Sequence, residues 1–513
     1  MKNEHVNIPK KPIRYYASAF LIVALLVLME IAILSVYVIR VSRAVSIVNL
    51  ALRLLSLLVM LYIVNEKENN AYKLAWCIPI LLFPLVGGFA YLIAKTRTIH
   101  KKAKERMLRT REHVKKEMPP CRHIANPNLY GKEKLYRYLQ RNGFHAHTAS
   151  NIRYYAMGTD MYKDLLADLR SAKRFIFMEY FIIQEGVMWN GILDILLEKA
   201  KQGVEVRLMY DGMGCIRTLP RNYHKMLSEC GINVKVFSPF VPFITTLQNN
   251  RDHRKITVID GEIAYTGGIN LADEYIGEID RFGVWKDSGI RFTGNTANSF
   301  TGFFLCQWNG ISRTTETNLC QYFSNNDVQY NGEIVIPYCV SPLDEHTYGK
   351  DVYMQIIHNA TDYLYIMTPY LVPGEDIMDA LALSAQSGVD VRLIVPSIPD
   401  HKLVHRVGQS KYRRLLAAGV RIYEYSPGFI HSKNFVSDDV ITTCGSVNLD
   451  YRSLYLHFEC GSVIFGKETA AKAKKDFIST FAQCKEIHYE NAPSHGYMTR
   501  LILAVIRTFE PLL

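Results

Sequence analysis

The sequence has few cysteines for its length, and they follow no recognisable pattern. Its 513 residues include 10 cysteines without a CxxC pair, which argues against a zinc module and against a small disulfide-bonded scaffold. Charge is also modest, since 21% of the residues are charged and 49% are hydrophobic; the chain is therefore not intrinsically disordered. We interpret it as a folded protein whose thiols face a reducing, cytosol-like compartment.

Acidic residues are scarcer than basic ones. Lysine and arginine total 60 against 48 aspartate and glutamate residues, which gives a net charge of +12. Such a balance suits anionic partners, whether nucleic acid, phosphates or an anionic membrane surface, and composition does not distinguish among them. At roughly 150 residues per domain, the length corresponds to about three folded units.

The first hundred residues carry three long apolar stretches. Residues 15–38 and 44–64 contain one charge each, and residues 74–94 contain none. Each stretch reaches the roughly 20 residues that a helix needs to cross a bilayer. We therefore expect a membrane segment over residues 1–95 with three transmembrane helices. Two spans are the alternative, because Arg53 in the middle of the second stretch costs about 2.5–3.5 kcal/mol on insertion scales.

A basic stretch follows the last apolar run. We expect residues 96–149 to form a juxtamembrane linker, in which basic residues crowd the part before Lys116. The positive-inside rule then predicts a multi-pass cell-membrane protein whose remaining chain lies in the cytoplasm. Three spans would leave the N-terminus outside, where its basic residues fit poorly, so the side of the N-terminus stays open. The basic stretch also suits contact with anionic lipid headgroups.

From about residue 150 the sequence repeats itself. KQGVEVRLMYDGMG, starting at Lys201, parallels QSGVDVRLIVPSIP, starting at Gln386. A helix, a glycine stop and an apolar strand are typical of an α/β fold with helices covering a sheet. The repeat predicts two similar α/β lobes over residues 150–330 and 331–490, and residues 491–513 are expected to form an amphipathic C-terminal helix.

Both repeats end in the same arrangement of polar residues. Each contains the pattern H-x-K-x4-D, followed by a pair of small residues and an asparagine that lies 17 residues after the histidine. Agreement at so many positions in two copies is a strong signal. The matching residues are His253, Lys255, Asp260 and Asn270 in the first copy, and His431, Lys433, Asp438 and Asn448 in the second.

This spacing suits a phosphate site. Residues i and i+2 of a strand point to the same face, so each histidine projects beside its lysine. The lysine supplies positive charge and the asparagine supplies amide donors for phosphate oxygens. Two such halves place two histidines across one phosphorus, where one attacks and the other protonates the leaving oxygen. We expect no metal and no cofactor, because two lysines and two asparagines neutralise the charge.

Each histidine also needs an acceptor on its second ring nitrogen. Asp287 lies 34 residues after His253, and Glu459 lies 28 residues after His431. Both carboxylates interrupt apolar, strand-like runs, where a charge requires a partner. They are therefore predicted to orient the histidines, the alternative being that each pairs with some other donor.

The remaining polar residues receive smaller roles. Asp260 and Asp438 belong to the candidate catalytic motif, but a residue at i+7 lies beyond the face that the histidine and lysine share. We expect these two aspartates to brace the motif more than to touch the phosphate. Isolated histidines, including His224, His346 and His457, are assigned no role.

The two H-x-K-x4-D runs resemble the HKD motifs of the phospholipase D superfamily. NNRDHRKITVIDGEIAYTGGINLADEYI from Asn249 and HSKNFVSDDVITTCGSVNLDYRSLYLHFE from His431 resemble, more specifically, the bacterial cardiolipin synthase family. The membrane stretch AYKLAWCIPILLFPLVGGFAYLI and the terminal RLILAVIRTFEPLL are also similar to this family. The resemblance covers nearly the whole chain.

The resemblance implies a phospholipase D α/β fold with one shared site. It also implies the joining of two phosphatidylglycerol molecules into cardiolipin and glycerol through a phosphatidyl-histidine, with phosphatidylglycerol and other anionic phospholipids as partners. The N-terminal motif of the superfamily generally supplies the nucleophile, which corresponds to His253. Another phosphatidyl transferase or a hydrolytic phospholipase D is the alternative. A nuclease is disfavoured by the membrane segment, and a scaffold by the completeness of both motifs. Acceptor preference and oligomeric state stay open.

Overall fold

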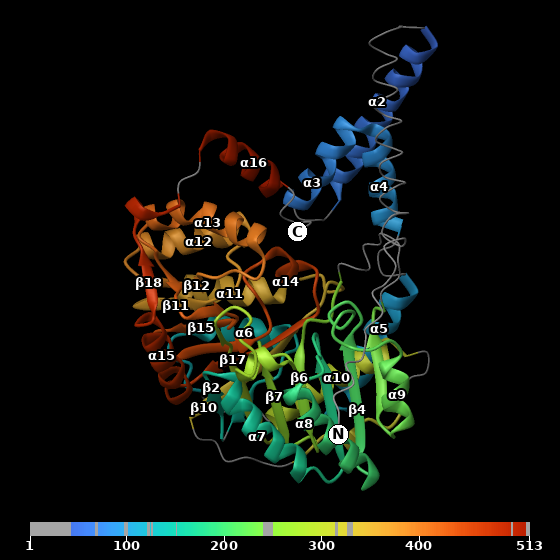
Figure 1. Cartoon of the computed structure of the whole chain (residues 1–513), viewed down its shortest axis with the longest axis vertical. Helices are drawn as coiled ribbons and strands as arrows, with labels where there is room; N and C mark the ends of the chain where they lie inside the picture. The colour runs from blue at the N-terminus through green and yellow to red at the C-terminus, as the bar shows by residue number, and fades with distance from the viewer. Residues whose placement is uncertain are drawn as a thin grey trace, which may run out of the picture. The chain divides into compact units, whose positions relative to one another are not determined.

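The chain forms two compact units, which are described separately (Figure 1). One contains the N-terminal helices and the C-terminal helix, and the other contains both sequence repeats. The expected span over residues 15–38 lies outside the described part. The computed structural model describes residues 43–66, 70–96, 101–120, 124, 127–149, 151–239, 250–312, 316–325, 332–493 and 496–508.

The smaller unit is helical. It comprises α2 (Arg43–Asn65), α3 (Asn70–Leu82), α4 (Pro84–Thr96) and α16 (Tyr497–Thr508). Large apolar side chains of α2 and α16 are exposed over much of their length. Within the stretches described, no helix combines the length and the hydrophobicity required to cross a membrane.

The stretch at 74–94 is two helices, whereas the sequence predicted one. Helix α3 ends at Leu82 and α4 begins at Pro84. Proline has no backbone N–H and disfavours helical geometry at the preceding residue, which accounts for the break. The two helices pack together, since the rings of Trp76 and Tyr91 meet edge to face with centroids 5.5 Å apart.

The larger unit contains two mixed sheets with the same central topology. In each, three parallel strands are extended on one side by antiparallel strands, and in the second sheet one more antiparallel strand adds to the other side. The order in the first sheet is β2 (Arg153–Tyr155), β9 (Gly289–Thr293), β7 (Ile263–Gly267), β6 (Lys255–Ile259), β3 (Phe175–Tyr180), β4 (Glu205–Asp211), β5 (Asn233–Phe237). The order in the second is β1 (His147–Ala149), β10 (Glu333–Val340), β17 (Glu459–Phe465), β16 (Ile441–Gly445), β15 (Asn434–Ser437), β11 (Tyr363–Met367), β12 (Asp390–Pro396), β13 (Arg421–Tyr425), β18 (Cys484–Ile487).

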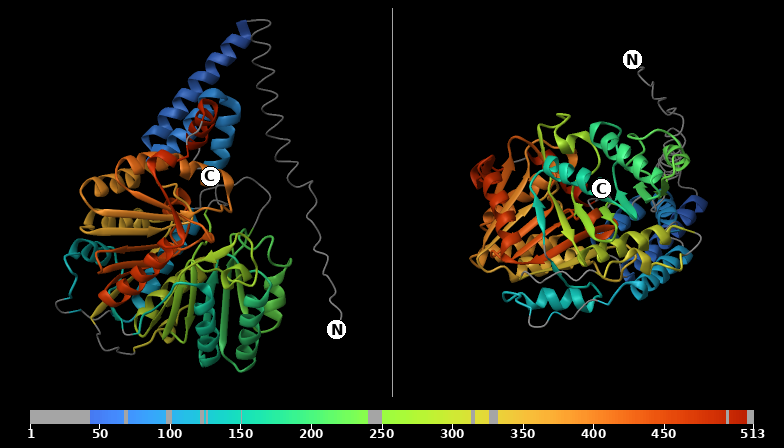
Figure 2. Two further views of the ribbon diagram at one scale, coloured as in Figure 1. Left: turned by 60° about the vertical axis from the view of Figure 1, so that its left-hand side comes forward. Right: turned by 90° about the horizontal axis from the view of Figure 1, so that it is seen from below.

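Helices cover these sheets, as the alternation of strand and helix in the sequence requires. Figure 2 shows the second lobe, in orange and red, beside the first, in green and yellow. With the first sheet lie α7 (Gly158–Ser171), α8 (Val187–Lys201), α9 (Tyr223–Glu229) and α10 (Thr296–Gly310). With the second lie α6 (Glu133–Arg141), α11 (Tyr348–Asn359), α12 (Glu375–Gln386), α13 (Lys402–Ala417), α14 (Tyr451–Tyr455) and α15 (Lys467–Phe481).

One hydrophobic cluster spans the two lobes, in addition to the core of each lobe. Phe177 and Val258 of the first sheet, Phe304 of α10, and Val335 and Ile464 of the second sheet belong to a single buried cluster. Burial of each large side chain contributes roughly 1.5–3 kcal/mol. The lobes are therefore packed as one body, and their relative position is set by the core.

Backbone pairing between the lobes adds to this packing. The short strand β8 (Val284–Lys286) pairs in parallel with β14 (Gly428–Ile430) of the other lobe. An isolated parallel bridge joins Asp252 to Phe458. Both pairings lie immediately before residues of the candidate site, so they fix that site at the boundary between the lobes.

Much of the segment over 96–149 is folded into the larger unit and does not form a free linker. Helix α5 (Lys101–Glu117) packs on α10, and Arg106 Nε donates a hydrogen bond to the Gly310 carbonyl at 2.9 Å. Leu135 and Leu139 of α6 are buried in the core of the second lobe. The many basic residues of this segment made the apolar faces of its helices, which are buried, difficult to recognise in the sequence.

Candidate functional site

The orienting pairs cross between the repeats. His253 Nδ1 lies 3.0 Å from both carboxylate oxygens of Glu459, which belongs to the second lobe. His431 Nδ1 lies 2.6 Å from Asp287 Oδ2, which belongs to the first. The sequence located both carboxylates, but it placed each after the histidine of its own repeat. Each lobe therefore supplies a histidine to one pair and a carboxylate to the other.

Backbone hydrogen bonds explain the crossing. The amide of His253 donates to the Phe458 carbonyl at 2.9 Å, one residue before Glu459. The amide of His431 donates to the Lys286 carbonyl at 2.7 Å, one residue before Asp287. Each histidine is thus tied through its main chain to the segment that carries its partner carboxylate. Neither pair can form within an isolated lobe.

The two lysines lie beside the histidines, as the i, i+2 spacing predicted. Lys255 Nζ donates to the His253 carbonyl, and Lys433 Nζ donates to the His431 carbonyl. Both lysines are 1% exposed. Each lysine also acts on the other repeat: Lys433 lowers the pKa of Lys255, and Lys255 lowers the pKa of His431. The groups of both repeats therefore form one electrostatic site.

Burial sets the protonation of this site. It lowers the pKa of His253 to about 3 despite the opposing Glu459. The pKa of His431 falls well below its usual value, through burial and then the ammonium groups of Lys433 and Lys255. Burial also lowers the pKa of Lys255 to about 7 and that of Lys433 to about 8. At neutral pH both imidazoles are neutral, and the lysines lie near their titration points.

The two carboxylates differ. Burial raises the pKa of Asp287 to about 7, against the opposing effect of Lys433. Burial also acts to raise the pKa of Glu459, but His253, His457 and Lys255 together hold it below its ordinary value. Glu459 receives a further hydrogen bond from the Ser446 hydroxyl. The Glu459 carboxylate is therefore ionised near neutral pH, whereas the Asp287 carboxylate is near its titration point there.

Gly268 of the first repeat occupies the position that Ser446 occupies in the second repeat, and it leaves room for Asp287. A Cβ added to Gly268 would lie 2.2 Å from Asp287 Oδ1, far inside van der Waals contact. Ser446, at the same place in the second repeat, bonds to its carboxylate instead. The small-residue pair noted in the sequence thus seats the two orienting carboxylates.

Aromatic rings surround the histidines. The ring of Phe181 is 5.0 Å from that of His253, and the rings of Tyr275, Trp285 and Phe429 lie within 5.9 Å of His431, centroid to centroid. These walls remove the imidazoles from water, which is the main cause of their lowered pKa values.

Asp260 and Asp438 lie apart from the paired histidines, carboxylates and lysines. They brace the motif, so they do not belong with the reactive groups of the site. The carboxylate of Asp260 accepts three backbone N–H groups at the start of β3, those of Lys173, Arg174 and Phe175, at 2.7–2.9 Å. Asp438 does the same at the start of β11 and also accepts from Lys132 Nζ at 2.6 Å. Each aspartate anchors the hairpin that carries its histidine.

The two asparagines are placed differently from each other. Asn270 Nδ2 donates to the Tyr275 hydroxyl at 2.7 Å, and its Oδ1 accepts from the Ile182 amide at 3.1 Å. Asn448 Oδ1 is buried and has no hydrogen-bond partner within the described residues. Their predicted role in binding phosphate stays a prediction.

His457 is a site residue that sequence reasoning missed. Its Nδ1 lies 3.7 Å from Glu459 Oε1, and its ring centroid is 5.7 Å from that of His253. His253, His457 and Glu459 together could ligate a metal ion, since their ligand atoms lie within 4.8 Å of one another. The signal was its position two residues before Glu459, which puts both side chains on the same face of an extended chain.

Comparison with known proteins identifies the family. The family model described as "Cardiolipin synthase, PLD-like domain" matches residues 165–281 and 353–481, and the model "Phospholipase_D-nuclease N-terminal" matches residues 54–95. The chain is 32% identical to a cardiolipin synthase of Alkalihalophilus pseudofirmus, over 87% of this chain and 90% of the relative. It is 33% identical to one of Staphylococcus aureus, over 85% and 90%. An uncharacterized Streptococcus mutans protein is 40% identical over 88% of this chain and 99% of its own length.

A solved structure agrees on the fold. The phosphatidylserine synthase of Haemophilus influenzae Rd KW20 superposes with a TM-score of 0.57 at 15% identity, covering 74% of this chain and 97% of that one. The two-lobed fold and the paired histidines define a phosphatidyl transferase of the phospholipase D superfamily. Within that superfamily, the chain belongs to the cardiolipin synthase family.

The bracing role of Asp260 predicts a defect in stability. Asp260→Asn removes the charge from a carboxylate that accepts three backbone N–H groups, so the free energy of unfolding should fall by about 1–3 kcal/mol. Turnover below the unfolding temperature should change little. Denaturant unfolding and initial rates measure the two effects, with Asp194→Asn, at an exposed helix position, as control. Lost turnover at unchanged stability would place Asp260 in the chemistry.

Gly268→Ala should abolish most activity by displacing Asp287 from His431. We expect a loss of about 100-fold or more in turnover, the size of a general acid–base contribution. The unfolding midpoint should also fall, because a clash in a buried site and a displaced carboxylate both destabilise the fold, so the rates are measured below the unfolding transition of the variant. Ser446→Ala puts the same residue at the matching position but removes only one hydrogen bond to Glu459, so its loss should be about tenfold. Equal effects of the two substitutions would contradict the steric argument.

The lowered lysine pKa values predict that anion binding weakens as the pH rises. Below pH 7 both Lys255 and Lys433 are protonated, and each loses its charge as the pH passes through its own pKa. The dissociation constant of sulfate, which keeps its charge over this range, should rise at least tenfold between pH 6 and pH 9. Calorimetric titration measures it. Lys255→Met should remove the lower step, and an affinity independent of pH in the wild type would refute the assignment.

Proposed function

We propose that this protein is a cardiolipin synthase that transfers a phosphatidyl group from one phosphatidylglycerol to another. The products are cardiolipin and glycerol. The observation that carries the proposal is the pair of neutral histidines, each oriented by a carboxylate of the opposite lobe and flanked by a buried lysine. Membership of the cardiolipin synthase family supports the choice of lipid.

In the first step His253 acts as the nucleophile. Its Nδ1–H donates to Glu459, which leaves the lone pair of Nε2 free to attack phosphorus. The bond from phosphorus to the glycerol oxygen breaks, and the His431 side supplies the proton that this oxygen takes up. The result is a phosphatidyl-histidine and free glycerol. Lys255 and Lys433 offset the charge that develops on the phosphate oxygens.

In the second step the roles of His431 reverse. It accepts the proton from the free glycerol hydroxyl of a second phosphatidylglycerol, whose oxygen attacks phosphorus. The bond between phosphorus and His253 Nε2 breaks, which forms cardiolipin and restores the neutral imidazole. Burial of the site favours the lipid alcohol over water as acceptor.

The difference between the two carboxylates supports this division of roles. Glu459 holds its charge and so favours the positive charge that His253 acquires when it bonds to phosphorus. Asp287, whose pKa is about 7, lets its pair with His431 store and return one proton. A general acid must hold a proton that it can donate, which suits the pair of His431 and Asp287. A cationic adduct is stabilised by a nearby negative charge, which suits the pair of His253 and Glu459.

We also propose that the protein works at the cytoplasmic face of the cell membrane, held there by transmembrane helices. Exposed apolar side chains gather on α2 and α16, including Leu50, Leu54 and Leu58 on α2 and Leu501 and Ile502 on α16, each more than half exposed. Such a surface is unfavourable in water and suits contact with lipid. Basic residues dominate α5, which follows α2, α3 and α4 in the chain, in keeping with the positive-inside rule.

The histidines are predicted to be individually essential, because two copies of the motif build one site. His253→Ala and His431→Ala should each lower cardiolipin formation from phosphatidylglycerol vesicles by about three orders of magnitude. His346→Ala, at an exposed histidine, is the matched control. Lipid mass spectrometry identifies the product, and accumulation of phosphatidic acid with little cardiolipin would favour the hydrolytic alternative.

Acid quenching and peptide mapping then test the division of roles. A phosphatidylated peptide from the rapidly quenched, active wild type should contain His253. An adduct found only on His431 would reverse the assignment.

A further inference from the structure

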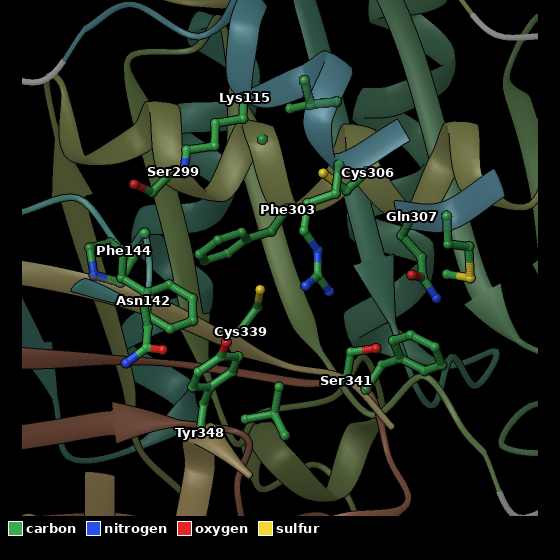
Figure 3. A pocket seen from close by; sticks show the side chains of 18 of the residues that line it. Lys115, Asn142, Phe144, Ser299, Phe303, Cys306, Gln307, Cys339, Ser341 and Tyr348 are labelled. Atoms are coloured by element: carbon green, nitrogen blue, oxygen red, sulfur yellow. The ribbon is translucent and has the colours of Figure 1, made fainter. Parts of the chain in front are cut away.

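A cavity lies behind the catalytic histidine. It is lined by α5, α10, the loop after α6 and strand β10, and its volume is about 160 Å³ (Figure 3). An engineered cavity of ~150 Å³ holds a benzene molecule, so this space accommodates a short alkyl segment. None of the reactive groups of the proposed mechanism lines it.

One wall of the cavity is the backbone pairing that positions the histidine. Arg254 and Phe458 both line it. Arg254 lies between His253 and Lys255, and Phe458 immediately precedes Glu459, so their side chains point to the opposite face from the site. The amide of Phe458 donates to the Arg251 carbonyl at 2.8 Å and its carbonyl accepts from His253. A molecule in the cavity would rest against the segment that joins His253 to Glu459.

Most of the lining is apolar and adaptable. Figure 3 shows Phe303, Cys306 and Cys339 around its middle. Burial raises the pKa of Cys306 to about 12 and that of Cys339 to about 11, so both thiols are neutral. Methionine and neutral cysteine fill irregular apolar spaces readily. The lining also includes Met107, Leu108, Val114, Met118, Val340 and Leu343.

Two polar nitrogens of the lining lack hydrogen-bond partners among the described residues. Gln307 is 2% exposed, and its Nε2 has no hydrogen-bond partner within the described residues. The buried Nε2 of His145 also has none there. Lys115 adds a positive charge, whereas Arg111 is already paired with Asp344. A buried donor left unpaired costs about 1–3 kcal/mol, which a ligand with acceptor oxygens would recover.

From the apolar lining and the unpaired donors together, we propose that this cavity binds a free fatty acid. The alkyl chain lies among the apolar side chains, and the carboxylate accepts from Gln307 Nε2 in the field of Lys115. Octanoate suits the volume. This inference does not depend on the proposed transfer reaction, because it concerns a separate space and a non-covalent ligand.

Binding is tested with the full-length protein in lipid nanodiscs, by equilibrium dialysis of labelled octanoate against empty nanodiscs. Gln307→Leu keeps the size of the side chain and removes the donor, so the octanoate dissociation constant should rise about tenfold, while binding of octane, which has no acceptor atom, is unchanged. Phe303→Trp fills the cavity and should abolish binding of both. Gln202→Leu, at an exposed helix end, is the matched control and should bind as the wild type does.

Three results would overturn the proposal. The first is equal octanoate binding by Phe303→Trp and the wild type, and the second is an unchanged octanoate affinity in Gln307→Leu. The third is tighter binding of lysophosphatidylglycerol than of octanoate, which would indicate a phospholipid ligand. Cys306→Leu is a second filling variant if Phe303→Trp unfolds. Thermal unfolding of each variant without ligand shows that a loss of binding is not a loss of fold. Gln307→Leu should be at least as stable as the wild type, because it removes a buried amide nitrogen that has no hydrogen-bond partner among the described residues.

Discussion

The hydrogen bonds from His253 to Glu459 and from His431 to Asp287 are the constraint on which the larger unit depends. Each joins an imidazole of one lobe to a carboxylate of the other, at 3.0 and 2.6 Å. A buried carboxylate without a partner is strongly destabilising, and so is a buried polar imidazole. The lobes therefore cannot separate without exposing or stranding four polar groups. The shared core and the two cross-lobe backbone pairings keep these groups together, so the interface that stabilises the fold also assembles the site.

Duplication alone would give two equivalent halves, but small differences between the repeats make them unequal. Gly268 leaves space for Asp287, whereas Ser446 donates a hydrogen bond to Glu459. His457 adds a second imidazole beside Glu459 only. These neighbours hold one carboxylate ionised, while burial lets the other keep a proton. In the proposed mechanism a nucleophile and a general acid need opposite protonation, and this departure from symmetry is what assigns the two roles to different histidines.

The sequence predicted those parts of the fold that depend on short-range pattern. The H-x-K-x4-D spacing placed each lysine beside its histidine, because alternation along a strand is local, and it indicated correctly that Asp260 lies beyond their common face. It could not predict that Asp287 serves His431, since that pairing depends on how two lobes dock. The break before Pro84 was predictable from proline chemistry but was masked by hydrophobicity. His457 was missed because its importance comes from His253, about 200 positions away in the chain.

Burial of the lysines connects this architecture to catalysis without a metal in the proposed scheme. A lysine held near its titration point by desolvation and by a second ammonium has less charge than one in water. An entering phosphodiester brings the missing counter-charge, which raises both lysine pKa values and draws protons into the site. Binding and charging are therefore linked, and the full positive field develops only when the phosphate is present. In the same dry environment that field acts on the developing negative charge more strongly than it could in water. Desolvation therefore lowers the positive charge of the empty site, and it strengthens the electrostatic interaction of the same site with a bound phosphate.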